Sequence, residues 1–366
     1  MKVICSRSLF IDAISTVQKA VGTHTTISIL EGILFEATDA VKLTGYDSET
    51  GIEHTMPAEV LVPGQVVIAA RLLGDVVRKL PDDTIKLEVD DNLMITIESG
   101  SSVFHLRGIS ALDYPKIPVV EDARLLKVPQ GKLVEMIRQT AFAASTDDSR
   151  PILNGINVIL EQGRLSLVAV DGFRLAVRHE AVEGRDKSVS FIVPAKAMYE
   201  VARVLPNVEG DISIYYSHNH ILFDSDETRL VSRLIRGEFM NYKSLIPQTA
   251  ESSLTVNRSH LLAACERASL IIESESKRFP VTFLSTSDTS LQVSARTDVG
   301  TTEESIDITL SGKRFDIDFN PRYFIDILKV VPDDQVKIDF SGSVGPCVIR
   351  PLEGDRYAYM ILPLRR

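Results

Sequence analysis

The chain has no tryptophan and only three cysteines among its 366 residues. Cys5, Cys265 and Cys347 lie far apart and form no CxxC pair, so the sequence offers neither a disulfide framework nor a cysteine zinc motif. We therefore expect buried thiols in a reducing cytoplasm. No apolar run approaches the roughly 18 residues of a transmembrane candidate, and Met1 to Cys5 reads as a strand rather than a signal peptide, so no membrane partner is expected.

Catalytic motifs are also missing. The sequence contains no GxxxxGKS or GxxxxGKT phosphate loop, no HExxH metal motif and no GxSxG nucleophile elbow. His218-Asn219-His220 is predicted to form a hairpin tip between two apolar strands. One enzymatic alternative stays open, a metal-dependent nuclease in which Asp147, Asp148 and His218 would have to meet around metal ions. Without an acid–base or nucleophile constellation, the sequence favours a scaffold that uses no cofactor and no metal.

A charge signature recurs three times along the chain. Each copy places a basic, an acidic and a basic residue 10, 6 and 3 positions before a proline: Arg71-Asp75-Arg78 before Pro81, Lys196-Glu200-Arg203 before Pro206, and Arg322-Asp326-Lys329 before Pro332. These offsets place the three charges on one face of a helix, with apolar residues on the other. Since the prolines are about 125 residues apart, which is the size of a domain, the pattern indicates a tandem repeat of domains rather than a solenoid.

The repeat extends to the surrounding elements. A strand precedes each signature helix, an alternating strand follows it, and a second helix is expected near the start of each copy. In the middle copy, short turns connect the predicted strands 156–160, 165–170 and 175–179, which favours antiparallel meanders. We therefore predict an α+β fold of three tandem similar domains, each with two helices packed on antiparallel sheets of roughly eight strands. The predicted domains span residues 1–120, 121–249 and 250–366.

The net charge of −10 argues against a nucleic-acid partner, but the distribution of charge argues for one. The predicted helices carry more cations than acids, and phosphate contacts need exposed Lys and Arg. Candidate phosphate contacts are Arg71, Arg78, Lys79, Lys132, Arg138, Lys196, Arg203, Arg267, Arg322 and Lys329. The alternative is that these faces are only solvated, with Lys196–Glu200 and Arg322–Asp326 as ion pairs one helical turn apart. The threefold recurrence leaves both interpretations open.

Several segments resemble a known family. Arg-Pro-Ile-Leu-Asn-Gly at 150–155, Val-Asp-Gly-Phe-Arg-Leu-Ala-Val at 170–177 and Tyr-Lys-Ser-Leu-Ile-Pro at 242–247 resemble the bacterial DNA polymerase III β subunit family, the sliding clamps. The chain end, Tyr-Met-Ile-Leu-Pro-Leu-Arg at 359–365, resembles it too. The Asp-Gly-x-Arg-Leu segment together with the closing Leu-Pro-Leu-Arg is specific, and the resemblance covers the whole chain.

The resemblance implies a ring-forming DNA-clamp fold without catalytic activity. Two copies would close head to tail around duplex DNA, with the helices lining the hole, and act as the processivity factor of a DNA polymerase. Asp75, Glu200 and Asp326 would keep the lining weakly basic, so that the ring slides. The implied partners are double-stranded DNA of any sequence, a second copy in a homodimer, the replicative DNA polymerase, the clamp-loader complex, repair polymerases and other proteins with a clamp-binding peptide. The implied location is cytoplasmic and nucleoid-associated. A clamp-like module that stays monomeric is the remaining alternative.

The resemblance also implies two protein contact sites. A peptide of the form Gln-Leu-x-Leu-Phe would dock in a cleft lined by Leu153, Val170, Gly172, Phe173, Arg174, Leu175, Leu245, Asn320, Tyr323, Val344, Met360, Leu362, Pro363, Leu364 and Arg365. The dimer joint would involve Leu106, Arg107, Ile271, Ile272, Glu303 and Glu304. Two residues depart from the family pattern: Phe173 replaces a common histidine, and Met240 replaces a common proline. Both changes make the expected cleft more apolar.

Overall fold

The computed structural model describes residues 1–22, 25–120, 124–182, 188–205, 209–273 and 281–365. These residues form two compact units, one of residues 1–131 and 200–234, the other of residues 132–199 and 235–366. The middle third of the chain thus contributes to both units. The domain boundaries at residues 120 and 249 stay a prediction. Pro206, the proline of the middle signature, lies outside the described residues.

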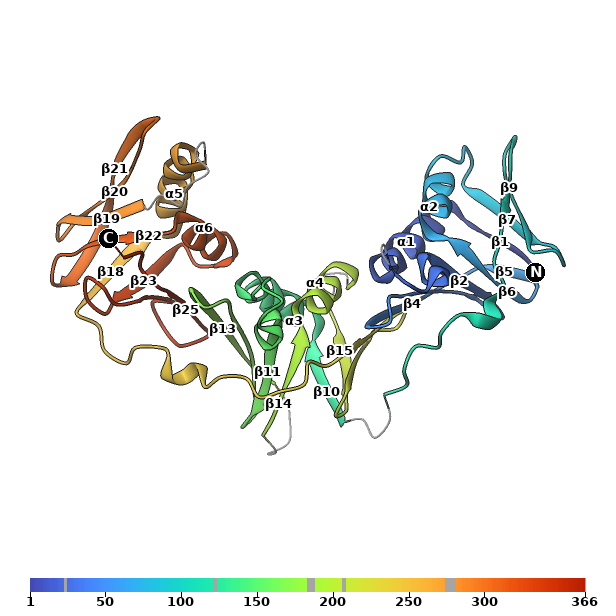
Figure 1. The fold of residues 1–366 in the computed structure, drawn as a ribbon, viewed down its shortest axis with the longest axis horizontal. Helices are drawn as coiled ribbons and strands as arrows, with labels where there is room; N and C mark the ends of the chain where they lie inside the picture. Colours follow the sequence, from blue (N-terminus) through green and yellow to red (C-terminus); the bar gives the residue numbers. More distant parts are fainter. Residues whose placement is uncertain (23–24, 121–123, 183–187, 206–208, 274–280, 366) are drawn as a thin grey trace. The chain divides into compact units, whose positions relative to one another are not determined.

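The first unit holds two antiparallel sheets (Figure 1). One sheet has the order β5-β1-β7-β8-β9, and the other has the order β10-β15-β16-β17-β4-β3-β2-β6. The strands are β1 (Lys2–Ser6), β2 (Gly32–Ala37), β3 (Val41–Tyr46), β4 (Thr50–Met56), β5 (Glu59–Val62), β6 (Gly64–Ala69), β7 (Thr84–Val89), β8 (Met94–Ser99), β9 (Ser102–Arg107), β10 (Arg124–Pro129), β15 (Asp211–Tyr216), β16 (His220–Asp224) and β17 (Thr228–Arg233). The helices are α1 (Arg7–Val17) and α2 (Ala70–Arg78).

The second unit holds one long antiparallel array with the order β14-β11-β12-β13-β25-β24-β23-β18-β21-β20-β19-β22. Its strands are β11 (Gly155–Glu161), β12 (Arg164–Val170), β13 (Arg174–Ala181), β14 (Val189–Pro194), β18 (Ser252–Asn257), β19 (Val281–Ser287), β20 (Ser290–Thr297), β21 (Gly300–Gly312), β22 (Asp316–Phe319), β23 (Gln335–Phe340), β24 (Cys347–Arg350) and β25 (Tyr357–Ile361). Its helices are α3 (Gln130–Arg138), α5 (Arg258–Glu273) and α6 (Pro321–Val330), while α4 (Ala195–Val204) crosses from the second unit into the first.

The helices form where the sequence pattern predicts them. In α2, Leu73, Val76 and Val77 are buried, while Arg71 and Arg78 are exposed on the other face. The helix α1 packs against α2 and over β3 and β4, and the rings of Phe10 and Phe35 meet edge to face at 5.8 Å between centroids. Similarly, α5 packs against α6 in the second unit.

The predicted strands of the middle copy are confirmed as β11, β12 and β13, which pair antiparallel as consecutive hairpins. The hairpin tip predicted at His218 to His220 is confirmed between β15 and β16. Asn320 caps α6, because its side-chain oxygen accepts a hydrogen bond from the Arg322 amide at 3.1 Å. Pro194 is the last residue of β14 and directly precedes α4, because its backbone continues the pairing with Gly155.

All three cysteines are free and buried, as predicted. Within the described residues, no helix is long and apolar enough to cross a membrane. No group of three or more His, Cys, Asp or Glu side chains in the described part of the chain could hold a metal ion. Asp147 instead stabilises a turn, since its Oδ1 accepts a hydrogen bond from the Ser149 amide at 2.9 Å, which lowers the pKa of the carboxyl.

Candidate functional site

The first signature helix exposes all three of its charged residues. Arg71, Asp75 and Arg78 lie on the solvent face of α2. Arg78 Nη2 lies 2.8 Å from Asp75 Oδ1, an ion pair three residues apart in which both side chains are about half exposed. Exposed pairs of this kind contribute little to stability. The helix therefore presents a cationic face that is only partly neutralised.

The second signature helix differs, because its acidic member is not at the surface. Glu200 is only 8% exposed, against the expectation that the three signature charges share one exposed face. Its Oε1 accepts a hydrogen bond from Arg203 Nη1 at 3.0 Å, and Lys19 Nζ donates to the Arg203 carbonyl at 3.3 Å. Burial lowers the pKa of Lys19, and the charge of Glu200 partly opposes that shift. Glu200, which was expected to be exposed, is therefore buried and paired with Arg203, with Lys19 beside them.

The third signature helix uses its acidic member for another contact. Asp326 Oδ2 accepts a hydrogen bond from Arg174 Nη1 at 2.5 Å, across 152 residues of sequence. Lys329 Nζ lies 2.9 Å from Glu266 Oε1 on α5. The three acids therefore have three different roles, although their sequence spacing is the same.

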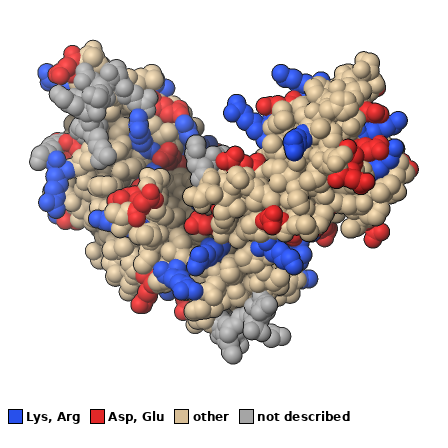
Figure 2. Space-filling model, turned by 45° about the vertical axis from the view of Figure 1, so that its right-hand side comes forward, with Lys and Arg blue, Asp and Glu red and all other residues tan. Residues whose placement is uncertain are grey.

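Of the other predicted phosphate contacts, Lys196 and Arg322 are exposed, and the rest fall into two groups. Arg267 is held by Glu304 through two contacts of 2.7 and 2.5 Å, and Lys132 lies 3.5 Å from Glu135. Arg71, Lys79 and Arg138 are exposed and form no ion pair with another described residue. Figure 2 shows that cations and acids are interspersed on the face it presents, rather than gathered in one patch of a single sign. Free cations are therefore fewer than the sequence count suggests.

A tight turn between β12 and β13 carries the most specific of the motifs. Asp171 Oδ1 accepts hydrogen bonds from the amides of Phe173 at 2.9 Å and Arg174 at 3.0 Å. Gly172 has a φ of +94°, which a side chain would make unfavourable. The turn leaves the Phe173 ring half exposed and stacked on Tyr323, with 6.5 Å between ring centroids. An exposed aromatic pair therefore stands beside the first turn of α6.

Arg174 fastens this turn to the neighbouring elements. Its Nε donates to Asp171 Oδ2 at 2.9 Å and its Nη2 donates to the Phe142 carbonyl at 2.6 Å, in addition to the contact with Asp326. The guanidinium carbon lies 4.8 Å from the centre of the Tyr323 ring. The resemblance placed Arg174 in the lining of the peptide cleft. In the structure, the guanidinium already binds three protein oxygens, so it positions Tyr323 and Phe173.

The apolar residues predicted for the cleft divide into buried and exposed sets. Leu153, Val170, Leu175 and Met360 lie in one buried cluster, so they are core residues of the sheet as well as cleft candidates. The exposed apolar candidates are Phe173, Leu245, Val344 and Leu362. Exposed apolar side chains beside a buried cluster form a surface that a partner can cover.

The chain end is fixed against this region by backbone hydrogen bonds. The Leu362 amide donates to the Phe173 carbonyl at 2.9 Å, and the Leu364 amide donates to the Asp318 carbonyl at 2.8 Å. Pro363 and Leu364 are half-buried and Arg365 is exposed. Asn320 serves mainly as the cap of α6. The Leu-Pro-Leu-Arg end therefore lies in extended form beside the aromatic pair.

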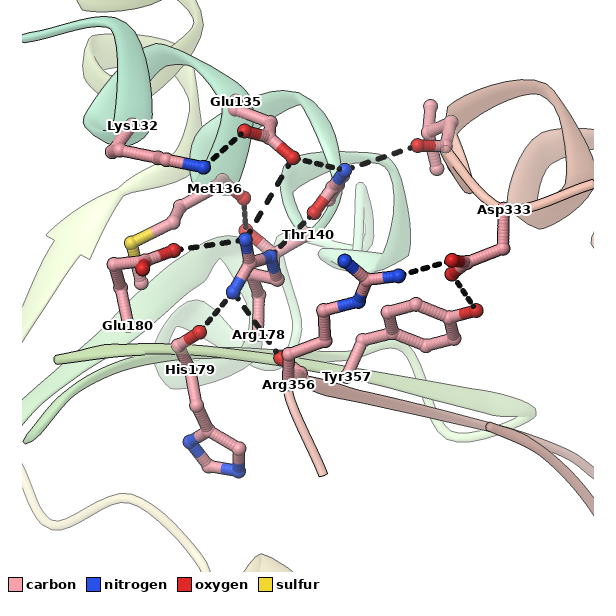
Figure 3. A network of polar contacts seen from close by, with 12 residues as sticks. Lys132, Glu135, Met136, Thr140, Arg178, His179, Glu180, Asp333, Arg356 and Tyr357 are labelled. Carbon is pink, nitrogen blue, oxygen red and sulfur yellow. Dashed lines mark hydrogen bonds and ion pairs between the residues drawn. The ribbon is translucent and has the colours of Figure 1, made fainter. Parts of the chain in front are cut away.

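A buried polar network that the sequence did not reveal joins β13 to β25 and α3 (Figure 3). Arg178 is only 3% exposed, and its Nε donates to Gln139 Oε1 at 2.6 Å while its Nη2 donates to Glu180 Oε2 at 2.9 Å. Gln139 in turn donates to the Val330 carbonyl at the end of α6, at 3.2 Å. Nearby, Asp333 accepts hydrogen bonds from Arg356 and from the Tyr357 hydroxyl. A buried arginine of this kind is stable only when most of its donors have partners.

Two strand edges are open at the positions predicted for the dimer joint. The strand β9, which contains Leu106 and Arg107, pairs only with β8 among the described residues. Within the described part of the chain, the first part of β21, at residues 300–307, pairs only with β20, because β18 pairs with its other edge from Ile308 onward. Glu303 and Glu304 lie on this open part, but Ile272 is buried. Sequence reasoning missed three exposed apolar residues near these edges: Val103, Phe104 and Leu270.

Three family models match the chain in succession. The N-terminal domain of the DNA polymerase III β subunit matches residues 1–118, the central domain matches residues 127–241, and the C-terminal domain matches residues 243–365. The three matches follow the threefold repeat of the signature, and together they cover nearly the whole chain.

Similar proteins agree with these matches over their full length. The β sliding clamp of Halalkalibacterium halodurans is 35% identical and that of Bacillus subtilis is 33% identical, each aligned over 100% of both chains. The crystal structure of the Bacillus subtilis DNA polymerase sliding clamp has a TM-score of 0.95 at 32% identity, covering 100% of this chain and 99% of that one. The chain therefore belongs to the family of DNA polymerase III β subunits, the β sliding clamps, which are non-catalytic processivity factors of that polymerase.

Proposed function

We propose that this chain forms a closed homodimer around double-stranded DNA. The DNA contact would be made by the exposed cations of the signature helices and by those of the helices beside them. The observation that supports this is the recurrence of one basic-acidic-basic pattern on α2, α4 and α6, with exposed basic residues in every copy. Because phosphates carry the contact, binding would not depend on DNA sequence.

The basic side chains differ in how readily they can contact a phosphate, because some of them already form ion pairs within the chain. An arginine already paired with a carboxylate must give up that partner to meet a phosphate, whereas Arg71, Lys79 and Arg138 form no ion pair with another described residue. Each phosphate contact adds about 0.9 to the slope of log affinity against log salt. We therefore expect these three residues to account for most of the salt dependence.

The test compares two triple variants in binding to a linear duplex over a salt series. Changing Arg71, Lys79 and Arg138 to serine should lower the salt slope by up to about 2.7. The matched control changes Lys86, Lys116 and Lys127 to serine, which removes the same charge from exposed positions outside the helices. Equal slopes for the two variants would contradict the proposed DNA-facing surface.

The homodimer would close by adding β9 of one copy to the open edge of β21 in the other. Open edges invite such pairing, and a joint of this kind removes them. The exposed apolar residues Val103, Phe104 and Leu270 would be covered in the joint, together with the candidates Leu106, Arg107, Ile271, Glu303 and Glu304. Glu304 already forms an ion pair with Arg267. This pair would remain intact at the rim of the joint.

The cleft would be the docking site of partner peptides of the form Gln-Leu-x-Leu-Phe. Its exposed surface is the aromatic pair of Phe173 and Tyr323 with Leu362, beside the buried cluster of Leu153, Val170, Leu175 and Met360. The replicative DNA polymerase, the clamp-loader complex, repair polymerases and other proteins with such a peptide would share it. Through its DNA partner, the protein would work at the nucleoid in the cytoplasm.

Peptide docking is testable with a labelled peptide in a fluorescence anisotropy titration. Phe173→Ala and Leu362→Ala remove exposed side chains and leave the buried cluster intact, so they should weaken binding about tenfold each without a change in melting temperature. Leu352→Ala is the control, since Leu352 is exposed to a similar degree in another turn. Equal affinity for all three variants and the unaltered protein would remove the cleft assignment and leave the ring proposal standing.

A further inference from the structure

The sheet face that carries the buried cluster continues past it. Val170, Leu175 and Met360 are register partners on β12, β13 and β25. Two residues farther along the same strands, Val168 pairs with Val177, and Val177 pairs with Ala358. Since residues two apart point to the same side of a sheet, both rows face the same way. The apolar face of the sheet beneath the cleft therefore extends by a second row, which is buried.

A third row on the same face has one apolar and two polar members. Ile159, Ser166 and His179 are partners across β11, β12 and β13. Ser166 Oγ and His179 Nδ1 lie 2.7 Å apart within hydrogen-bond distance. Rows two residues apart are separated by about 6.8 Å, so the third row lies about 14 Å from the first. That distance equals the length of about four extended residues.

The second and third rows form the floor of a hollow of about 610 Å³. Val177, Ala358 and Ile159 contribute apolar side chains, and Tyr242 and Ile246 form a wall from the segment that precedes β18. This volume lies within the range of about 300–1,000 Å³ that is typical of ligand sites. Tyr242 and Val177 also belong to the buried cluster beneath the cleft, so the hollow and the cleft lie over one packed core.

The rim of the hollow offers no unpaired charge among the described residues. Arg164 Nη2 lies 2.8 Å from Asp355 Oδ2, Lys243 Nζ lies 3.5 Å from Glu161 Oε2, and Arg350 Nε lies 3.5 Å from Asp339 Oδ2. Burial, helped by the charge of Arg164, lowers the pKa of His179 to about 4, so its ring is neutral at pH 7. These pairs hold three cations and three acids, so the rim offers no net attraction to a charged occupant of either sign, which favours a neutral one.

We propose that this hollow extends the cleft and holds the residues that flank a docked partner peptide, with an apolar side chain over Val177 and Ala358 and uncharged polar residues near Ser166 and His179. The inference rests on the proposed peptide cleft. The hollow would help the cleft to select among partner peptides by their flanking residues, because a flank of about four residues spans the distance from the first row to the third.

The experiment uses the full-length protein and labelled peptides in anisotropy titrations. One peptide is the capped core Gln-Leu-Ala-Leu-Phe, and the others add Val-Ser-Gln-Ser or Asp-Ser-Asp-Ser to either end. On the unaltered protein, the neutral extension at one end should tighten binding about tenfold, the effect of burying one apolar side chain. The acidic extension should give less than a third of that gain.

A filling variant tests the location. Ser166→Phe places a ring in the third row, so the extension should lose its gain while the core peptide keeps its affinity. Thr84→Phe on β7 is the control for the added ring, and melting temperatures report whether both variants fold. If the core peptide binds but neither extension improves its affinity, the proposed role of the hollow is overturned and the cleft proposal stands. A gain that survives Ser166→Phe in a folded protein overturns it too, whereas failure of the core peptide to bind overturns the cleft and this inference together.

Discussion

Replacing Asp326 with asparagine tests whether this residue moderates a cationic helix face, as its spacing predicts, or positions Arg174, as its contact indicates. The signature spacing predicts that Asp326 moderates a cationic helix face, as Asp75 does in α2. In the structure, its Oδ2 instead holds Arg174, whose guanidinium lies against Tyr323 beneath the exposed Phe173 ring. Asp326→Asn keeps the shape of the side chain and removes the charge that holds Arg174.

The expected magnitude follows from the geometry of the pair. A hydrogen bond to a charged group contributes about 1.5–3 kcal/mol. Asp326 is 41% exposed, so solvent screens part of the interaction, and the asparagine oxygen can still accept one hydrogen bond from Arg174. We therefore expect a loss of about 1 kcal/mol, which corresponds to about fivefold weaker peptide binding if Arg174 positions the aromatic pair.

Asp75→Asn is the matched control, because it removes the same charge from the same position of another signature helix. Its partner Arg78 is half exposed, so the loss in stability should be no more than about 0.5 kcal/mol, and peptide affinity should not change. Anisotropy titration with the core peptide and urea unfolding measure the two quantities. Equal peptide affinity for the two variants, within twofold, would refute the positioning role of Asp326.

Three further predictions concern stability and assembly. The pKa of His179 is about 4 in the folded protein, below the unfolded value of about 6.5. The neutral His179 ring therefore contributes to stability fully above pH 6.5, and this contribution is lost as the pH falls toward 4. The melting temperature of His179→Gln should consequently fall less between pH 7.5 and pH 5 than that of the unaltered protein. Arg178→Met leaves Glu180 without its buried partner and should lower the free energy of unfolding by about 3 kcal/mol in urea titration, and no measurable loss would contradict a structural role of the network. Phe104→Asp on β9 should give the single-chain mass of 40.5 kDa in sedimentation, whereas a dimer that persists in this variant would argue against the proposed joint.

The fold could be predicted from the sequence because its signals are local. The helix at Arg71 to Arg78 has a charged and an apolar face within eight residues, and the strand at 165–170 is bounded by turn residues on both sides. The turn at Asp171 to Arg174 lies between two predicted strands, and Asp followed by Gly is a local signal that favours this geometry. Repetition of these local patterns at a spacing of one domain then indicated the tandem organisation.

The candidate site could be predicted only as a set of residue types. The family resemblance predicted Phe173, Arg174 and Met360 as cleft residues, but the sequence could not tell that Met360 is buried and Phe173 half exposed. It did not reveal Arg178 as a buried arginine, because the partners Gln139 and Glu180 come from different elements. The hollow beside the cleft also depends on strand register, which sequence alternation alone does not fix.

The sequence by itself determined the helices, the strands, the threefold repeat and the placement of like charges at like positions, because periodicity acts over a few residues. Only the tertiary structure decided what each charge does. Asp75 is paired at the surface, Glu200 is buried against Arg203, and Asp326 binds an arginine 152 residues away. The physical reason is that the energy of a charge depends on its burial and its partners, and both are set by which distant strands and helices pack beside it.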